Sequence, residues 1–259
     1  MLLEVKDLNI SLTSEKSVAE HISFRLGQGE MLSIVGSSGA GKTTICKAIM
    51  GLLGNTYRAD GEILFQGEDL LDLPERKRQT IYGKEICLIM QNPMTAFNPS
   101  IRVGRQMEKT YLLHHGKTPR QEMQRLFAAI LQKLGLEDTQ RILNSYPFTL
   151  SGGMLQRLMI AAALMCQPAL LVADEATTAI DACNRIGLMR ELKSFCKDGM
   201  SVLFVTHDLR SASVSDRILV MDRGQIVEQG KTEQILNTPK EDYTKYLLNV
   251  CRLERREMS

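Results

Sequence analysis

The feature that most constrains how this chain folds is a short loop at residues 36–43, with the sequence GSSGAGKT. An apolar run at residues 31–35 precedes the loop, and an amphipathic segment follows it. The pattern GxxxxGK[ST] between a strand and a helix is typical of a loop whose backbone N–H groups surround phosphates. Such a loop indicates an α/β core that binds a phosphorylated ligand.

The residue types of this loop suit a nucleotide that carries a metal ion. Small residues let consecutive backbone N–H groups wrap the β- and γ-phosphates, and Lys42 adds a mobile positive charge. The Thr43 hydroxyl is a hard oxygen ligand for Mg²⁺. The predicted nucleotide-binding residues of this segment are Gly36, Ser37, Ser38, Gly39, Ala40, Gly41, Lys42, Thr43 and Thr44.

Apolar periodicity predicts that the α/β core is interrupted by a helical insertion. Strands are predicted at residues 3–9, 20–26, 31–35, 61–65, 85–90, 170–173, 202–206, 217–221 and 225–228. Helices are predicted at residues 43–53, 103–114, 119–134 and 154–166. We therefore expect a core from residues 1–91 and 167–240, a helical subdomain at residues 92–166, and a short tail at residues 241–259.

Composition and charge disfavour several other classes of protein. The net charge of +2 favours neither nucleic acid nor an anionic membrane surface as a partner. The first residues carry acidic side chains early, unlike a signal peptide, and the longest apolar stretch is half the length that spans a bilayer. The six cysteines are far apart and without a CxxC pair, which favours inert reduced thiols in a soluble intracellular protein.

Polar residues follow two of the predicted apolar strands. Asp174 and Glu175 come directly after residues 170–173, and His207 comes directly after residues 202–206. Ligands of open α/β sheets bind at the carboxyl ends of strands. Two adjacent acids alone are typical of a solvated loop. Beside a phosphate loop, Asp174 is expected to hold Mg²⁺ through water, Glu175 to act as general base, and His207 to contact the γ-phosphate.

Two further polar residues have alternative interpretations. Gln91 follows the strand at residues 85–90, and it is either a simple polar cap or a contact to Mg²⁺ at the start of the helical insertion. Asp181 is either an ordinary helix N-cap or part of the site. The residues alone do not separate these readings.

A second anion-binding pattern occurs at residues 150–157, with the sequence LSGGMLQR. Ser151, Gly152 and Gly153 predict an exposed helix N-terminus, where free N–H groups and the helix dipole favour an anion. Within a monomer this second site is redundant with the phosphate loop. It is not redundant if it serves the nucleotide of another molecule.

Together these six motifs resemble, in order and spacing, the ATP-binding subunit of an ABC transporter. The resemblance covers essentially the whole chain and implies a P-loop NTPase core that binds ATP and Mg²⁺. It implies a mixed sheet flanked by helices, with an N-terminal antiparallel β part. In this family two subunits stack head to tail, so that Ser151 and Gly153 of one cap the γ-phosphate held by Lys42 of the other. Asp181 would belong to the D-loop, among the nucleotide-binding residues.

The resemblance also implies partners. The ATPase would work at the cytoplasmic face of the cell membrane as a peripheral subunit, with two transmembrane permease subunits docked near Gln91. The second ATPase subunit would be either identical or different, an extracytoplasmic solute-binding protein would act indirectly, and nucleic acid would not be a partner. The helical insertion would supply the docking surface, and ATP hydrolysis would drive solute translocation.

A narrower resemblance concerns the cargo. Residues 91–99 (QNPMTAFNP) and residues 242–248 (DYTKYLL) resemble the dipeptide, oligopeptide and nickel importers. Longer members of that group continue with a cysteine-containing extension, so the short tail favours nickel or metal-chelate import over peptide import. A soluble ABC ATPase acting on nucleic acid fits a single compact cassette poorly. A non-catalytic cassette is disfavoured by Glu175 and His207.

Two positions depart from the family pattern. Residues 10–13 contain no aromatic residue to stack on adenine, although Leu12 offers an apolar contact. Met154 stands where the pattern usually has a glutamine, whose hydrogen bonds methionine cannot make. We therefore expect modest ATP affinity and weak selectivity for the base.

Overall fold

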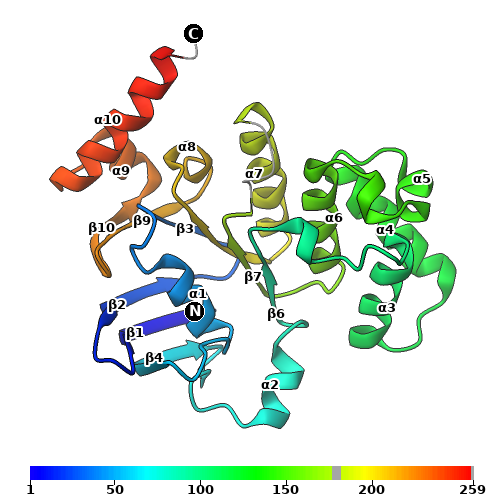
Figure 1. Cartoon of the computed structure of the whole chain (residues 1–259), viewed down its shortest axis with the longest axis horizontal. Helices are drawn as coiled ribbons and strands as arrows, with labels where there is room; N and C mark the ends of the chain where they lie inside the picture. The colour runs from blue at the N-terminus through cyan, green and yellow to red at the C-terminus, as the bar shows by residue number, and fades with distance from the viewer. Residues whose placement is uncertain (177–181, 258–259) are drawn as a thin grey trace.

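A six-stranded sheet forms the centre of the computed structural model, which describes residues 1–176 and 182–257 (Figure 1). Its strand order is β10-β9-β3-β8-β7-β6. The strands are β3 (Met31–Gly36), β6 (Ile86–Ile89), β7 (Leu170–Asp174), β8 (Ser201–Thr206), β9 (Arg217–Asp222) and β10 (Gln225–Lys231). All neighbours are parallel except β9 and β10. Strands buried on both faces are expected to be mostly apolar, and β3 and β8 are buried along their whole length with apolar residues at most positions.

A second, antiparallel sheet contains the N-terminal strands in the order β2-β1-β4-β5. These are β1 (Leu3–Leu12), β2 (Ser17–Leu26), β4 (Tyr57–Phe65) and β5 (Glu68–Asp69). The first three extend up to four residues beyond the predicted limits, because their outer faces are solvated and carry polar residues at the ends. Helix α1 (Lys42–Ile49) shares an apolar core with this sheet and with one face of the six-stranded sheet.

Helix α1 is shorter than predicted. It ends at Ile49 rather than near residue 53, because Gly51 adopts a left-handed φ of 63° just after the C-cap Met50.

A group of helices lies to one side of the six-stranded sheet (Figure 1). It contains α3 (Val103–His115), α4 (Arg120–Lys133), α5 (Thr139–Asn144) and α6 (Gly152–Leu164), with single turns η1 (Pro93–Thr95) and η2 (Pro147–Thr149). These helices share one apolar core with α7 (Ala182–Cys196) and with the second face of β7 and β8. Helices α3 and α4 match the prediction within a residue at each end, although Pro119 precedes α4 rather than opening it. Helix α5 was not predicted.

Three helices lie near β9 and β10, namely α8 (Leu209–Ala212), α9 (Thr232–Asn237) and α10 (Asp242–Glu257). Helix α2 (Glu75–Ile81) lies away from them, between β5 and β6 in the chain (Figure 1). Strands β9 and β10 form a hairpin, in which Arg223 and Gly224 have φ values of 44° and 83° in a two-residue turn. No helix in the described part of the chain is both long enough and apolar enough to cross a membrane.

Candidate ATP-binding and hydrolysis site

The phosphate loop follows β3 and packs closely between β2 and β9. A Cβ atom on Gly41 would lie 2.7 Å from the Val18 carbonyl oxygen, and one on Gly36 would lie 2.2 Å from the Met221 carbonyl oxygen. Gly41 also has φ of 93°, so glycine is required there for both space and conformation. Residues 37–39 are exposed, whereas Ala40 is buried. The loop therefore presents its central peptides to solvent on a rigid base.

Lys42 begins α1 and points back into the loop. Its side chain is buried, with the residue 5% exposed, and its Nζ donates to the carbonyl oxygens of Gly36 and Ser37, both at 2.8 Å. Burial lowers the pKa of Lys42, while the charges of Glu175 and Asp174 oppose that shift. A charged phosphate is a stronger hydrogen-bond acceptor than a neutral carbonyl. The Lys42 ammonium can therefore exchange the Gly36 and Ser37 carbonyls for a phosphate that binds in the loop.

Thr43 and Asp174, the predicted Mg²⁺ ligands of the loop and of β7, lie side by side. The Thr43 hydroxyl donates to Asp174 Oδ1 at 3.2 Å. Burial raises the pKa of Asp174, and the hydrogen bond from Thr43 partly offsets that shift. A hydroxyl and a carboxylate at this distance are hard oxygen donors, which fit Mg²⁺. Thr44, the next residue of α1, is half-buried.

The Glu175 carboxylate, just after β7, contacts one residue that follows β6 and one that follows β8. Its Oε2 accepts from Gln91 Nε2 at 2.7 Å, and its Oε1 lies 3.2 Å from His207 Nδ1. Its backbone N–H donates to the Val205 carbonyl at 2.9 Å, and its φ of 49° is left-handed. Non-glycine residues in this conformation cluster at functional sites. The structure thus brings Gln91, Glu175 and His207 together at the carboxyl edge of the sheet.

The start of α6 contains the second predicted anion site. Ser151 is the N-cap, and its hydroxyl oxygen accepts from the Met154 N–H at 3.3 Å. Because of this cap the helix begins at Gly152, two residues before the predicted start. Ser151 and Gly152 are exposed and Gly153 is half-buried. Among the residues that the structure describes, no hydrogen bond or ion pair links this helix start to the phosphate loop.

The two departures from the family pattern have distinct surroundings. Met154 is half-buried and packs on the apolar core of the helical group. Leu12 pairs with Tyr57 of β4, and residues paired across antiparallel strands project from the same face. An aromatic ring thus lies beside Leu12. The sequence analysis missed Tyr57, because no local signal shows a pairing between strands so far apart in the chain.

The remaining predictions concern Asp181 and the six cysteines. Asp181 lies outside the described residues. Cys46, Cys87, Cys166 and Cys196 are buried thiols outside any disulfide, and Cys251 is half-buried. The side chain of Cys183 also lies outside the described part.

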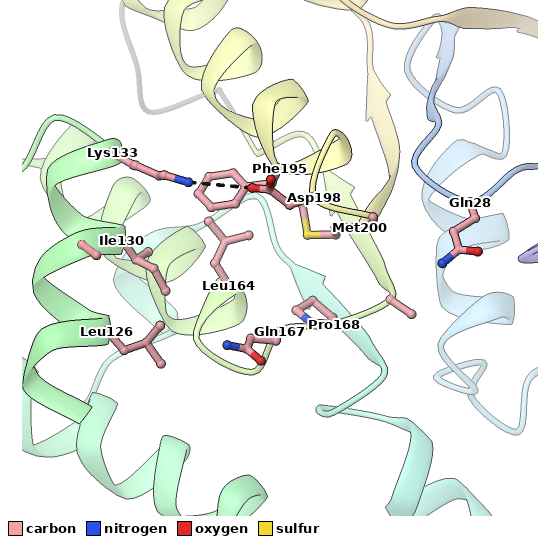
Figure 2. A pocket seen from close by; sticks show the side chains of 13 residues that line it. Gln28, Leu126, Ile130, Lys133, Leu164, Gln167, Pro168, Phe195, Asp198 and Met200 are labelled. Atoms are coloured by element: carbon pink, nitrogen blue, oxygen red, sulfur yellow. Dashed lines mark ion pairs between the residues drawn. The ribbon is translucent and has the colours of Figure 1, made fainter. Parts of the chain in front are cut away.

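A separate pocket of about 560 Å³ occupies the opposite edge of the sheet (Figure 2). It is lined by α4, by the end of α7, and by Pro168, Ala169 and Met200 just before β7 and β8. Lys133 reaches across it, with Nζ 3.8 Å from Asp198 Oδ2 and 4.9 Å from the centre of the Phe195 ring. The pocket lies at the amino ends of the strands, so it is distinct from the site formed by Lys42 and Glu175.

Comparison with known proteins identifies the class to which this fold and site belong. The family model for the ABC transporter matches residues 19–178, and the chain belongs to that family. It is therefore an enzyme that binds and hydrolyses ATP.

Similarity to known ATP-binding proteins and to solved cassette structures extends over most of the chain. It is 41% identical over 251 residues to the metal-staphylopine import system ATP-binding protein CntD of Staphylococcus aureus (strain Mu50), covering 96% of this chain and 92% of that protein. It is also 41% identical to the oligopeptide transport ATP-binding protein OppD of Bacillus subtilis, covering 95% and 71%. A dimeric, post-hydrolysis structure of the ATP-binding cassette MJ0796 with ADP and Pi shares 27% identity, with a TM-score of 0.78 over 89% of this chain and 99% of that one.

Proposed function

We propose that this chain is the ATPase subunit of an importer and that its catalytic site is the cluster at the carboxyl edge of the six-stranded sheet. The observation that carries the assignment is the shared contact of Gln91 and His207 with Glu175, beside the pair Thr43 and Asp174. Residues 36–44 bind the ATP phosphates. Mg²⁺, held by Thr43 and Asp174 with Gln91 near it, would neutralise charge on the phosphates.

Each side chain then has one role in hydrolysis. Lys42 leaves the carbonyls of Gly36 and Ser37 and binds phosphate. Glu175 accepts the proton of the attacking water, and the Gln91 amide holds that carboxylate in place. His207, whose Nδ1 faces Glu175, contacts the γ-phosphate with the other side of its ring.

The start of α6 serves a second ATPase subunit, identical or different. Ser151, Gly152 and Gly153 would cap the γ-phosphate bound by that subunit, and Asp181 would be a further nucleotide-binding residue. The exposure of Ser151 and its separation from Lys42 support this arrangement. The dimeric cassette to which the chain is similar supports it as well.

The remaining assignments concern organisation and cargo. Residues 1–91 and 167–240 form the ATP-binding core, residues 92–166 the helical subdomain, and residues 241–259 a tail. Two permease subunits bind the helical subdomain at the cytoplasmic face of the membrane, with an extracytoplasmic binding protein acting through them and no role for nucleic acid. We favour a nickel or other metal chelate as cargo, because the metal-staphylopine import ATPase is a relative at 41% identity; the equally identical oligopeptide relative makes peptide import the alternative.

The decisive experiment is ATPase stimulation in the transporter reconstituted with its permease and binding-protein subunits. A nickel chelate is expected to stimulate hydrolysis several-fold and a dipeptide to leave the basal rate unchanged. The reverse result would establish the peptide alternative. If neither solute acts and RNA stimulates hydrolysis of the isolated chain, the importer proposal is wrong.

A further inference from the structure

The C-terminal helix α10 contacts the phosphate loop directly. The Ser37 backbone N–H donates to the phenolic oxygen of Tyr243 at 3.1 Å, although 206 positions separate the two residues. Tyr243 is half-buried, whereas Ser37 is exposed. Tyr243, near the start of the tail, therefore holds Ser37, the second residue of the loop. Tyr243 has no role in the proposed steps of hydrolysis.

The start of α10 is itself held by two sets of contacts. The Glu228 carboxylate on β10 accepts from the N–H groups of Lys240 and Glu241, at 2.8 and 3.3 Å, just before the helix begins. On its apolar side, Leu248 is buried in a cluster that includes Val35, and Tyr243 packs against the same cluster. Val35 directly precedes the loop. This cluster thus fixes α10 relative to the strand that leads into the loop.

Both backbone polar groups of Ser37 are hydrogen-bonded. Its N–H is bound to Tyr243, and its carbonyl accepts from Lys42 Nζ at 2.8 Å. When Lys42 moves to phosphate, that carbonyl loses its partner. The bond from Tyr243 uses neither Lys42 nor the Ser37 carbonyl, so the movement of Lys42 to phosphate does not itself break it, and the loop keeps its orientation at Ser37. Pre-organising a binding loop raises affinity, because less conformational freedom is lost on binding.

We propose that Tyr243 is a positioning residue for ATP binding, whose hydroxyl holds the Ser37 peptide while Lys42 exchanges carbonyl partners for phosphate. The proposal rests on the assignment of residues 36–43 as the phosphate loop. It makes the tail helix a part of the nucleotide site.

The test compares two variants of the full chain that each lose one phenolic hydroxyl. Tyr243→Phe is expected to weaken MgATP and MgADP binding, measured by calorimetry, by about fivefold. Tyr246→Phe is the matched control, because Tyr246 lies on the same helix with its ring 6.5 Å from that of Tyr243 and is 62% exposed. The control is expected to bind both nucleotides like the parent.

Kinetics and amide exchange distinguish positioning from a purely structural role. In Tyr243→Phe the KM for ATP should rise about fivefold while kcat stays within about twofold, and the Ser37 amide should exchange faster by NMR. A fall in Tm with unchanged ATP affinity would make Tyr243 a structural residue only. Unchanged affinity and unchanged Ser37 exchange would also overturn the proposal.

Lys42→Ala separates failure of this proposal from failure of the site assignment. If Lys42→Ala loses ATP binding and Tyr243→Phe does not, the role of Tyr243 is refuted and the phosphate loop stands. If Lys42→Ala binds ATP like the parent, the assignment of the loop itself is wrong.

Discussion

The carboxyl edge of the six-stranded sheet and the start of α6 both suit a phosphate, but they differ in how complete they are. At the edge, Glu175 contacts Gln91 and His207, and Lys42 is buried among loop carbonyls. At the start of α6, Ser151 is exposed and its hydroxyl caps its own helix. Figure 1 shows α6 apart from α1, on the far side of the sheet's β6 edge. A complete site and an exposed half-site in one chain are what a head-to-tail dimer requires.

The largest expected effect tests the complete site. Glu175→Gln keeps an oxygen facing Gln91 but cannot accept a proton, so ATP hydrolysis should fall by about 100-fold or more. ATP affinity should stay within about twofold, and a closed ATP-bound dimer should accumulate, as measured by light scattering. Glu122→Gln, on the exposed face of α4, is the control with parental activity. Hydrolysis at the parental rate in Glu175→Gln would show that Glu175 is not the base.

The next effect tests the half-site. Ser151→Ala should lower steady-state hydrolysis by about tenfold, while the ATP affinity of the isolated subunit stays within about twofold. Asp138→Ala is the matched control, because Asp138 caps α5 through the Arg141 N–H at 3.3 Å. Each variant loses a cap worth about 1 kcal/mol, seen as a similar fall in Tm. If both variants lose the same ATPase activity, helix stability explains the effect and the half-site is not supported.

A smaller effect concerns the adenine end of the complete site. Leu12→Phe adds an aromatic ring, which should tighten ATP binding by about fivefold. In the parent chain, calorimetry is expected to show comparable affinities for ATP and GTP. A strong preference of the parent for ATP would mean that another ring, with Tyr57 beside Leu12 the first to test, already stacks on the base.

Met154→Gln is expected to act on stability more than on activity. The half-buried Met154 packs on the helical core, so glutamine should lower Tm by about 2–4 °C. Hydrolysis should change by less than about twofold, since Ser151 and the backbone N–H groups remain. A rise in activity of several-fold would show that the half-site uses a side-chain hydrogen bond at this position.

The smallest effect comes from the pocket of Figure 2. Lys133→Ala removes one ion pair and one ring contact at the opposite edge of the sheet, with Lys133 mostly exposed. Tm should fall by about 2 °C or less, and the affinity for ATP should not change. A several-fold shift in ATP affinity would show that the pocket at this edge is coupled to the nucleotide site.

Much of the site was predictable because its residues follow local patterns. The glycines, Lys42 and Thr43 are required by a tight loop between a strand and a helix, and that requirement is local in the chain. Asp174, Glu175 and His207 could be expected at one edge, because parallel strands end on the same side of a sheet. The length of α1 was mispredicted, since Gly51 ends the helix before residue 53, the predicted last residue.

The amino-acid sequence by itself determined the residue types of the phosphate loop, the apolar strands around it and the glycine-rich start of α6. Tertiary structure alone decided which partners those residues have. It set Gln91 and His207 on either side of Glu175, Tyr57 beside Leu12, and Tyr243 on the Ser37 peptide. The reason is physical: a loop or helix start depends on neighbouring residues, whereas a hydrogen bond across 206 positions depends on strand order and on how α10 packs.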